Sequence, residues 1–378
     1  MDFSCYKEKN KLVMDTIQLK KTKGIPTCLV NIMQHDYLDK IANAEPGSYC
    51  KNPEEVYLTA QRNLGASLMD QYLVFNPLEM GREGYDNAVL GATTGAKQIV
   101  CDGILIDSPE AVVEHLETVA FEKIRKNISE FNEEKRVREI IDYEYEIQNK
   151  LGDNLLKTGY GTIGFPNLCY TDYGYENYFM AYALYPEVIE KHFSLQADYY
   201  YLNNKAAARA YREAGLPPLY RLDHDIADSR GTLVNVKSLD QLWMPHFARA
   251  LEPVLNTDVR LIWHCDGNLM EMVPRLIDVG IKGFQGFQYE DGMDYKKICG
   301  MKTREGENLI IWAGVSVTRT LPFGTPADVK NEMKYLVENG PETGLFLSAS
   351  SSIAPGAPWE NIEMMIEGFR YYREHGRD

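Results

Sequence analysis

A regular alternation of short apolar runs and helical segments constrains the fold of this chain more than any other feature. Five apolar runs follow Gly215, and a segment of helical periodicity comes after each of them. The runs cover residues 219–222, 259–263, 283–287, 309–313 and 344–347. The helical segments lie near residues 238–255, 269–279, 295–301, 326–338 and 358–375. Strands that are apolar on both faces and alternate with helices predict a parallel sheet covered by helices.

The number of repeats favours a closed barrel over an open sheet. A further strand is expected at residues 25–33, and more between residues 73 and 163. No glycine-rich dinucleotide-binding motif follows any of the strands, which weighs against a Rossmann domain. We therefore predict an α/β fold of the (β/α)8 TIM-barrel type. It forms one domain over residues 1–378, with residues 1–24 as an N-terminal helical extension.

The composition of the chain excludes several classes of binding partner. Its 378 residues carry a formal net charge of −15, and a binder of nucleic acid or of an anionic membrane needs a concentrated positive surface instead. No stretch approaches the roughly 20 apolar residues of a membrane span. Seven scattered cysteines without a CxxC pair are typical of reduced thiols. We expect a cytoplasmic protein whose partners are small molecules or proteins.

Chemically versatile side chains follow the predicted strands. Asp223, His224 and Asp225 end one apolar run, and His264, Cys265 and Asp266 end the next. Later runs end in residues 288–291, which include Tyr289 and Glu290, in Ser316, and in the serine stretch 348–352. The carboxyl ends of barrel strands meet at one mouth, so these groups are expected to converge on a site for metal binding or acid–base chemistry.

Each of these residues also has a purely structural explanation. A histidine after a strand is commonly a hydrogen-bonded structural residue, and Asp225 or Asp266 could cap a following turn or helix. Cys265 would face away from its neighbours if the strand continued. The segment 159–178, which is rich in glycine and tyrosine and contains Tyr160 and Tyr170, could line a pocket for a planar substrate or could pack partly into the core.

Four longer motifs resemble the uroporphyrinogen decarboxylase superfamily, and the similarity spans roughly residue 54 to the C-terminus. They are HCDGN at 264–268, GIKGFQGFQYEDGMD at 280–294, WAGVSVTRTLPFGTPADV at 312–329 and APGAPWENI at 354–362. The resemblance implies a (β/α)8 barrel of the kind shared with methionine synthase (UROD/MetE-like). The superfamily contains the tetrapyrrole decarboxylase and many corrinoid-linked methyltransferases.

This chain lacks residues that are typical of two branches of that superfamily. The decarboxylase carries an N-terminal Arg-Gln-Ala-Gly-Arg motif that meets substrate carboxylates, whereas residues 31–37 here contain no arginine. A substrate with eight carboxylates needs a cationic pocket, so tetrapyrrole decarboxylation is the alternative reading. Coenzyme M methyltransferases of the family bind zinc through a His-x-Cys pair and a later cysteine. Here His264 is kept, but Asp266 stands at the first cysteine position and the later one falls in the serine stretch, so a coenzyme M or thiol methyltransferase is a further alternative.

A site of nitrogen and oxygen ligands suits the aryl methyl ether O-demethylase branch. There a zinc-like ion acts as a Lewis acid on the ether oxygen while the methyl group passes to cob(I)alamin. The resemblance implies that His264 and Asp266, with help from Asp225 or Glu290, bind such an ion or protonate the leaving oxygen. Asp223, His224, Asp225 and Glu290 are the candidate acid and base groups, and Tyr160, Tyr170 and Tyr289 are the candidate substrate contacts.

The expected partners follow from the same reading. The chain contains no Asp-x-His-x-x-Gly corrinoid signature, so the corrinoid is expected on a separate protein that docks over the barrel mouth. The other partner would be a small methyl donor, and a homodimer is left open. A third possible function is that of a binding subunit, in which the barrel has no catalytic activity.

Overall fold

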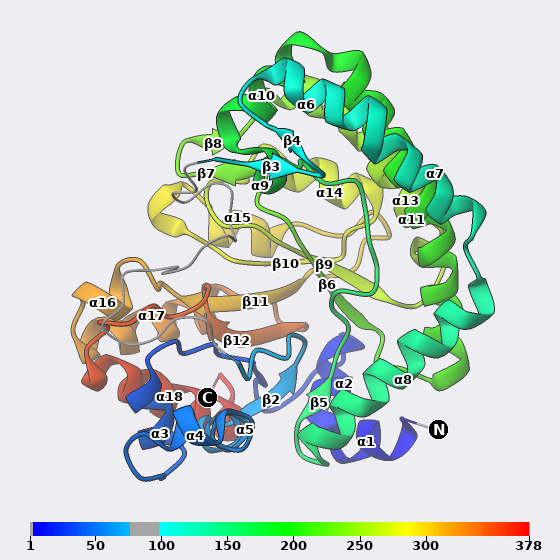
Figure 1. Cartoon of the computed structure of the whole chain (residues 1–378). Helices are drawn as coiled ribbons and strands as arrows, with labels where there is room; N and C mark the ends of the chain where they lie inside the picture. The colour runs from blue at the N-terminus through cyan, green and yellow to red at the C-terminus, as the bar shows by residue number, and fades with distance from the viewer. Residues whose placement is uncertain (1–2, 76–97, 378) are drawn as a thin grey trace.

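Eight parallel strands form the centre of the protein. The computed structural model describes residues 3–75 and 98–377 (Figure 1). Neighbours in the sheet are also neighbours in chain order, β1-β2-β5-β6-β9-β10-β11-β12, and β12 pairs with β1. A parallel bridge between Gly159 and Tyr220 joins the β5 side of the sheet to β6, with Gly159 N donating to Leu219 O at 3.0 Å. The sheet is therefore closed, which confirms the predicted (β/α)8 barrel. The strands are β1 (Thr27–Cys28), β2 (Ala66–Met69), β5 (Leu156–Lys157), β6 (Leu219–Asp223), β9 (Arg260–His264), β10 (Gly283–Gln285), β11 (Ile310–Val315) and β12 (Leu345–Ala349).

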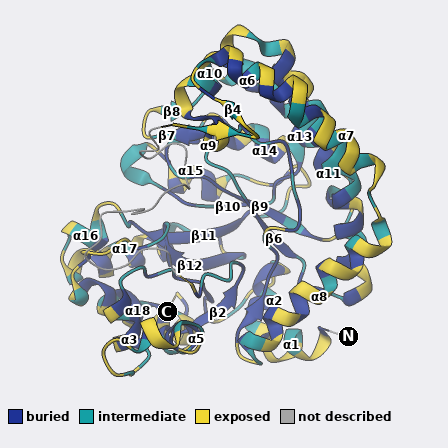
Figure 2. Cartoon of the chain, in the orientation of Figure 1, coloured by how far each residue is buried: buried dark blue, intermediate teal, exposed yellow. Residues whose placement is uncertain are grey.

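Helices surround the barrel, with buried inner faces and exposed outer faces (Figure 2). Those in the first half are α3 (His35–Ile41), α4 (Ser48–Lys51), α5 (Pro53–Leu64), α6 (Pro109–His115), α7 (Phe121–Ser129), α8 (Glu133–Leu151), α9 (Tyr170–Tyr173), α10 (Tyr175–Leu184) and α11 (Pro186–Ala214). Those in the second half are α12 (Val236–Ser238), α13 (Met244–Leu255), α14 (Val273–Val279), α15 (Tyr295–Gly300), α16 (Thr320–Phe323), α17 (Pro326–Asn339) and α18 (Trp359–His375). In the described part of the chain, the connections also contain two π-helical turns (Leu116–Ala120, Leu239–Trp243), a 3-10 turn (Tyr289–Asp291) and two hairpins. The hairpins pair β3 (Val100–Cys101) with β4 (Ile104–Leu105) and β7 (Ala227–Asp228) with β8 (Gly231–Thr232). No helix in the described ranges is long and apolar enough to cross a membrane.

Local sequence explains where several helices begin. Ser108 accepts a hydrogen bond from Ala111 N at the start of α6, and Pro109 occupies the first helical position. Thr325 and Asp328 form a reciprocal capping box at the start of α17. These capping residues therefore fix where α6 and α17 begin.

The N-terminal extension closes the bottom of the barrel. Its helices α1 (Ser4–Lys9) and α2 (Lys11–Ile17) precede β1, and Val13, Met14 and Ile17 of α2 pack against the inward side chains of the strands. That inner layer consists of Cys28, Leu68, Leu156, Leu219, Ile262, Ile310, Trp312 and Phe346. The lower half of the barrel is thus a filled apolar core, so a ligand can enter only from the opposite end.

A buried histidine in α11 makes the stability of the fold depend on pH. His192 is 5% exposed, and burial, with His115 nearby, lowers its pKa from 6.5 to about 4. The folded chain therefore binds fewer protons than the unfolded chain between about pH 4 and 6.5, so stability falls as the pH drops through that window, by up to about 3 kcal/mol. We expect His192→Gln to remove this part of the pH dependence, measured by urea unfolding at pH 7 and pH 5. An unchanged pH profile in the variant would contradict it.

Candidate metal centre at the barrel mouth

Along the strands, every second side chain faces the inside of the barrel, and these inward side chains change from apolar to polar at the barrel mouth. Leu219 and Ile262 belong to the inner apolar layer, and two residues further along their strands come Arg221 and His264. Asp223 follows on β6 and lies opposite His264 of β9 in the sheet register. The sequence thereby places a carboxylate and an imidazole side by side on the inner face.

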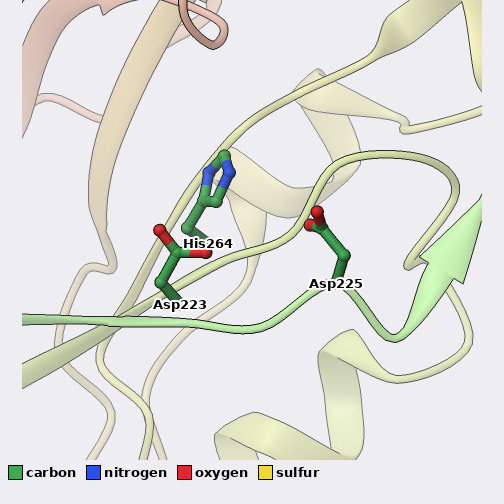
Figure 3. Close-up of side chains that lie close together, drawn as sticks. All are labelled: Asp223, Asp225 and His264. Carbon is green, nitrogen blue, oxygen red and sulfur yellow. The ribbon is translucent and has the colours of Figure 1, made fainter. Parts of the chain in front are cut away.

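Three side chains gather at this point. A metal-ligating atom from each of Asp223, Asp225 and His264 lies within 4.8 Å of the other two (Figure 3). Asp225 comes from the loop directly after β6, and its Oδ1 accepts a hydrogen bond from Asp266 N at 2.8 Å. Two carboxylates and one imidazole at this spacing are a suitable ligand set for a divalent cation such as zinc.

Two buried atoms, one in the cluster and one in the adjoining Asp266, lack a hydrogen-bond partner. His264 is 7% exposed, and its Nδ1 has no hydrogen-bond partner among the described residues. Asp266 Oδ1, which lies 3.9 Å from His264 Nε2, is also without one, while Asp266 Oδ2 accepts from Ser351 Oγ at 3.2 Å. Buried polar atoms are nearly always satisfied, so these unpaired atoms indicate that a ligand completes the site.

Arg221 organises the carboxylates beside the cluster. It is 6% exposed, and its Nε donates to Asp70 Oδ2 at 2.5 Å while its Nη1 donates to Asp223 Oδ2 at 2.9 Å. The guanidinium lies 4.9 Å from the ring centre of Tyr160, whose hydroxyl donates to the same Asp223 oxygen at 3.2 Å. Asp223 Oδ2 is therefore fully occupied, and its other oxygen remains for a ligand.

The local charges set the protonation of the two carboxylates in opposite directions. Burial would raise the pKa of Asp223, but His264 and Arg221 outweigh it and hold that pKa below its usual value. Burial raises the pKa of Asp225, and the neighbouring Asp266 and Asp223 add to the effect while His264 opposes it. Asp223 is thus the carboxylate of the pair that stays ionised most readily.

Two cavities meet at Arg221 and Asp223. The mouth cavity has a volume of about 320 Å³, includes Asp70, His264 and Gln285 in its wall, and has Trp312 on the side of the inner apolar layer. The side cavity, of about 360 Å³, lies beyond Arg221 and Asp223 and is lined by Tyr160, Phe165, Tyr199 and Tyr200. A small aromatic molecule could therefore lie next to the cluster.

The sequence of the second half of the chain matches one protein family. Residues 175–372, slightly more than half of the chain, match the model described as uroporphyrinogen decarboxylase (URO-D). The chain belongs to the URO-D family. The matched region holds β6 and β9, so all three residues of the cluster come from the part that carries the family signature.

Solved structures agree with the fold of this URO-D family member. A methyltransferase from Methanosarcina mazei aligns over 96% of this chain and 98% of its own, with a TM-score of 0.59 and 18% sequence identity. A vitamin-B12-independent methionine synthase of Listeria monocytogenes (TM-score 0.36, 16% identity, 62% of this chain and 69% of that one) and one of Shewanella sp. W3-18-1 (0.34, 13%, 49% and 55%) are too distant to support an argument. No curated protein matches the sequence of the chain.

The structure brings some of the residues predicted from the sequence into the cluster and leaves others outside it. His264, Asp223 and Asp225 form the cluster, Asp266 adjoins it, and Tyr160 contacts Asp223. His224 points elsewhere, because its Nε2 accepts a hydrogen bond from Leu168 N at 3.0 Å and its ring stacks on Tyr170. Burial lowers the pKa of His224 to about 4, so it is a neutral packing residue at pH 7 rather than an acid.

Three other predicted residues lie outside both cavities. Glu290 accepts hydrogen bonds from Ser316 Oγ at 2.9 Å and from Thr318. Tyr289 packs between Phe287 and Tyr295. Tyr170 uses its hydroxyl to donate to the backbone oxygen of Asp225 at 2.6 Å, and so supports the loop of the cluster instead of lining a cavity.

Several residues of the site were not predicted. Arg221, Asp70, Gln285 and Trp312 all face the mouth cavity. The period of two along β6 would have found Arg221, since it stands two residues before Asp223. Asp70 follows the four-residue strand β2, which gave no clear signal in the sequence.

The absence of a side chain at Gly286 leaves room for the His264 ring. A Cβ at Gly286 would lie 2.6 Å from His264 Nδ1, and the φ of Gly286 is +85°. We expect Gly286→Ala to displace the imidazole and weaken zinc binding about 10-fold or more, as measured by competition with a chelator. Gly306→Ala is the matched control, because Gly306 has a φ of +83° and nothing within 4 Å of its Cβ position. Equal zinc affinities of the two variants would contradict this role.

Proposed function

We propose that this URO-D family protein is a methyltransferase that moves a methyl group from a small aryl methyl ether to the corrinoid of a separate protein. The observation that carries the proposal is the cluster of Asp223, Asp225 and His264 at a small cavity in the barrel mouth. Active sites of TIM barrels lie at this end of the strands. The methyltransferase with the same fold supports the reading as an analogy.

The cluster fits a zinc-like ion. His264 would hold it together with Asp223 and Asp225, and Asp266 is close enough to take part, as its 3.9 Å separation from His264 indicates. The unpaired His264 Nδ1 and Asp266 Oδ1 support such a ligand. When bound, the ion would supply Lewis-acid polarisation of the ether oxygen, so that the phenolate could leave without prior protonation.

The side chains of the chain would orient the donor and the ligand set. Arg221 and Tyr160 bond to one oxygen of Asp223 and leave the other for a ligand. Tyr160 and Phe165 offer flat faces to an aromatic ring on the side-cavity wall. The wall of the mouth cavity is mainly polar, and Leu29, Leu73 and Trp312 provide apolar surface within it against which the ring could pack.

The same geometry ranks the alternatives lower. Decarboxylation of a tetrapyrrole with eight carboxylates needs free cations, and Arg221 is already bonded to two aspartates. Activation of a thiol acceptor in the manner of the coenzyme M branch uses cysteine ligands, and Cys265 is buried with its thiol donating to Asp266 O at 3.1 Å. Neither alternative draws on the paired carboxylates that the cluster provides.

The test is methyl transfer in a mixture of the protein, a reduced corrinoid protein and candidate methyl ethers. We expect the visible absorption of the corrinoid to change on methylation, with loss of the change in Asp223→Asn. Glu290→Gln should retain it, because Glu290 bonds to Ser316 and Thr318 outside the cluster. Formation of coproporphyrinogen from uroporphyrinogen would favour the decarboxylase instead, and neither reaction would favour a binding subunit.

A further inference from the structure

Among the described residues, each arginine that lines the two cavities is already paired with a carboxylate. Arg136 and Arg221 are the Lys or Arg side chains among the described residues lining these cavities. Arg221 is bonded to Asp70 and Asp223, and Arg136 Nη1 lies 3.3 Å from Glu139 Oε2 while its Nε donates to Asn203. The described walls therefore offer no uncommitted cation to an anionic substrate.

Carboxylates are in excess around the mouth. Asp70 and Asp223 line the mouth cavity, and Asp225 and Asp266 adjoin His264. These four carboxylates face the single guanidinium of Arg221. A carboxylate on the donor would lose its hydration and meet this excess of like charge, which is costly without a partner of opposite charge.

The remaining surface suits an uncharged aromatic molecule. Tyr160, Phe165, Tyr199 and Tyr200 line the side cavity. Trp312, which is 3% exposed, contributes a further aromatic side chain to the wall of the mouth cavity.

We infer that the methyl donor is an aryl methyl ether whose ring carries no carboxylate, and that the paired arginines and surplus aspartates exclude methoxybenzoates. The inference rests on the proposed function and narrows its substrate class. It concerns binding in the two cavities, so it can be tested without any methyl transfer.

The decisive comparison uses two molecules of nearly the same shape. The dissociation constants of 3-methoxybenzamide and 3-methoxybenzoate are measured on the full chain, freed of metal ions with a chelator, by titration calorimetry at pH 7 and without a corrinoid protein. We expect the benzoate to bind at least about 50-fold more weakly than the amide, because its charge is buried without a partner. Equal binding, tighter binding of the benzoate, or binding of neither molecule would overturn the inference.

A variant tests the cause of the exclusion. Asp70→Asn releases Arg221 Nε from its carboxylate while Asp223 still pairs with Nη1. We expect benzoate binding to strengthen about 10-fold and amide binding to change less than threefold. Asp258→Asn, an exposed acid on the N-terminal side of β9, is the control and should alter neither. No gain for the benzoate in folded Asp70→Asn would contradict the role of the arginine pairing. If that variant does not fold, the comparison on the unaltered chain still decides.

The two proposals fail in different ways. Absence of methyl transfer from every ether tried, with the amide still bound more tightly than the benzoate, would overturn the proposed function and leave the charge selectivity standing. Transfer from methoxybenzoates as fast as from the neutral ethers would overturn the charge selectivity and leave the methyltransferase standing.

Discussion

Replacing His264 by alanine should lower the affinity of the protein for zinc by more than about 100-fold. Loss of a residue that only supports a metal ligand commonly costs 10- to 100-fold, and His264 would be a ligand itself. It supplies the one imidazole in the cluster, with a ring nitrogen within 4.8 Å of a carboxylate oxygen of Asp223 and of Asp225. Methyl transfer should fall below detection in the same variant. Metal analysis and chelator competition measure the first effect, and the corrinoid absorption assay measures the second.

A matched control separates the cluster from histidine content in general. His246 lies on α13, near Glu190 and away from the barrel mouth, so His246→Ala should keep near-stoichiometric zinc. Undiminished zinc in the His264 variant would exclude the cluster as the metal site. A metal-free wild-type protein with full activity would remove the Lewis-acid role.

Replacing Arg221 by methionine should cost about 3–5 kcal/mol of stability. The guanidinium is buried between Asp70 and Asp223, and its removal leaves carboxylates in the barrel without a counter-charge. Urea unfolding at pH 7 measures the change. Asp70→Asn in the Arg221→Met background should recover part of the loss, because it removes one of the two uncompensated charges.

Arg209→Met provides the comparison for this effect. Arg209 also bonds to acids, Glu134 and Glu213, but it lies on the surface of α11, where ion pairs are screened by solvent. We expect a much smaller loss of stability there than for Arg221→Met. If the two arginine variants were equally stable, the buried network would not support the barrel mouth.

The sequence predicted the second half of the barrel best, because its strands are apolar on both faces and alternate with clear helices. β6, β9, β10, β11 and β12 all lie at the predicted runs. β1 lies within the strand expected at residues 25–33, whereas β2 and β5, of four and two residues, left a weak pattern. The described part of the long connection from β2 to β5 holds the β3–β4 hairpin and helices α6, α7 and α8, which made β5 harder to recognise.

The candidate site was predictable in the residues that belong to the strands and less so in those beyond them. Strand periodicity and register put Asp223 and His264 on the inner face, opposite one another. Beyond the strand end, orientation depends on contacts made by distant loops. Leu168 N holds His224 away from the cluster, and Ser316 and Thr318 hold Glu290. The period of two along β6 could place Arg221 on the inner face, but not its pairing with Asp70, which precedes it by about 150 residues.

Anomalous diffraction at the zinc absorption edge, from crystals of the full chain grown with zinc, tests the metal centre most directly. The account predicts a peak between the carboxylates of Asp223 and Asp225 and the imidazole of His264, and its disappearance in His264→Ala. Crystals without a peak there, in which these side chains bond instead to other groups of the protein, would contradict it.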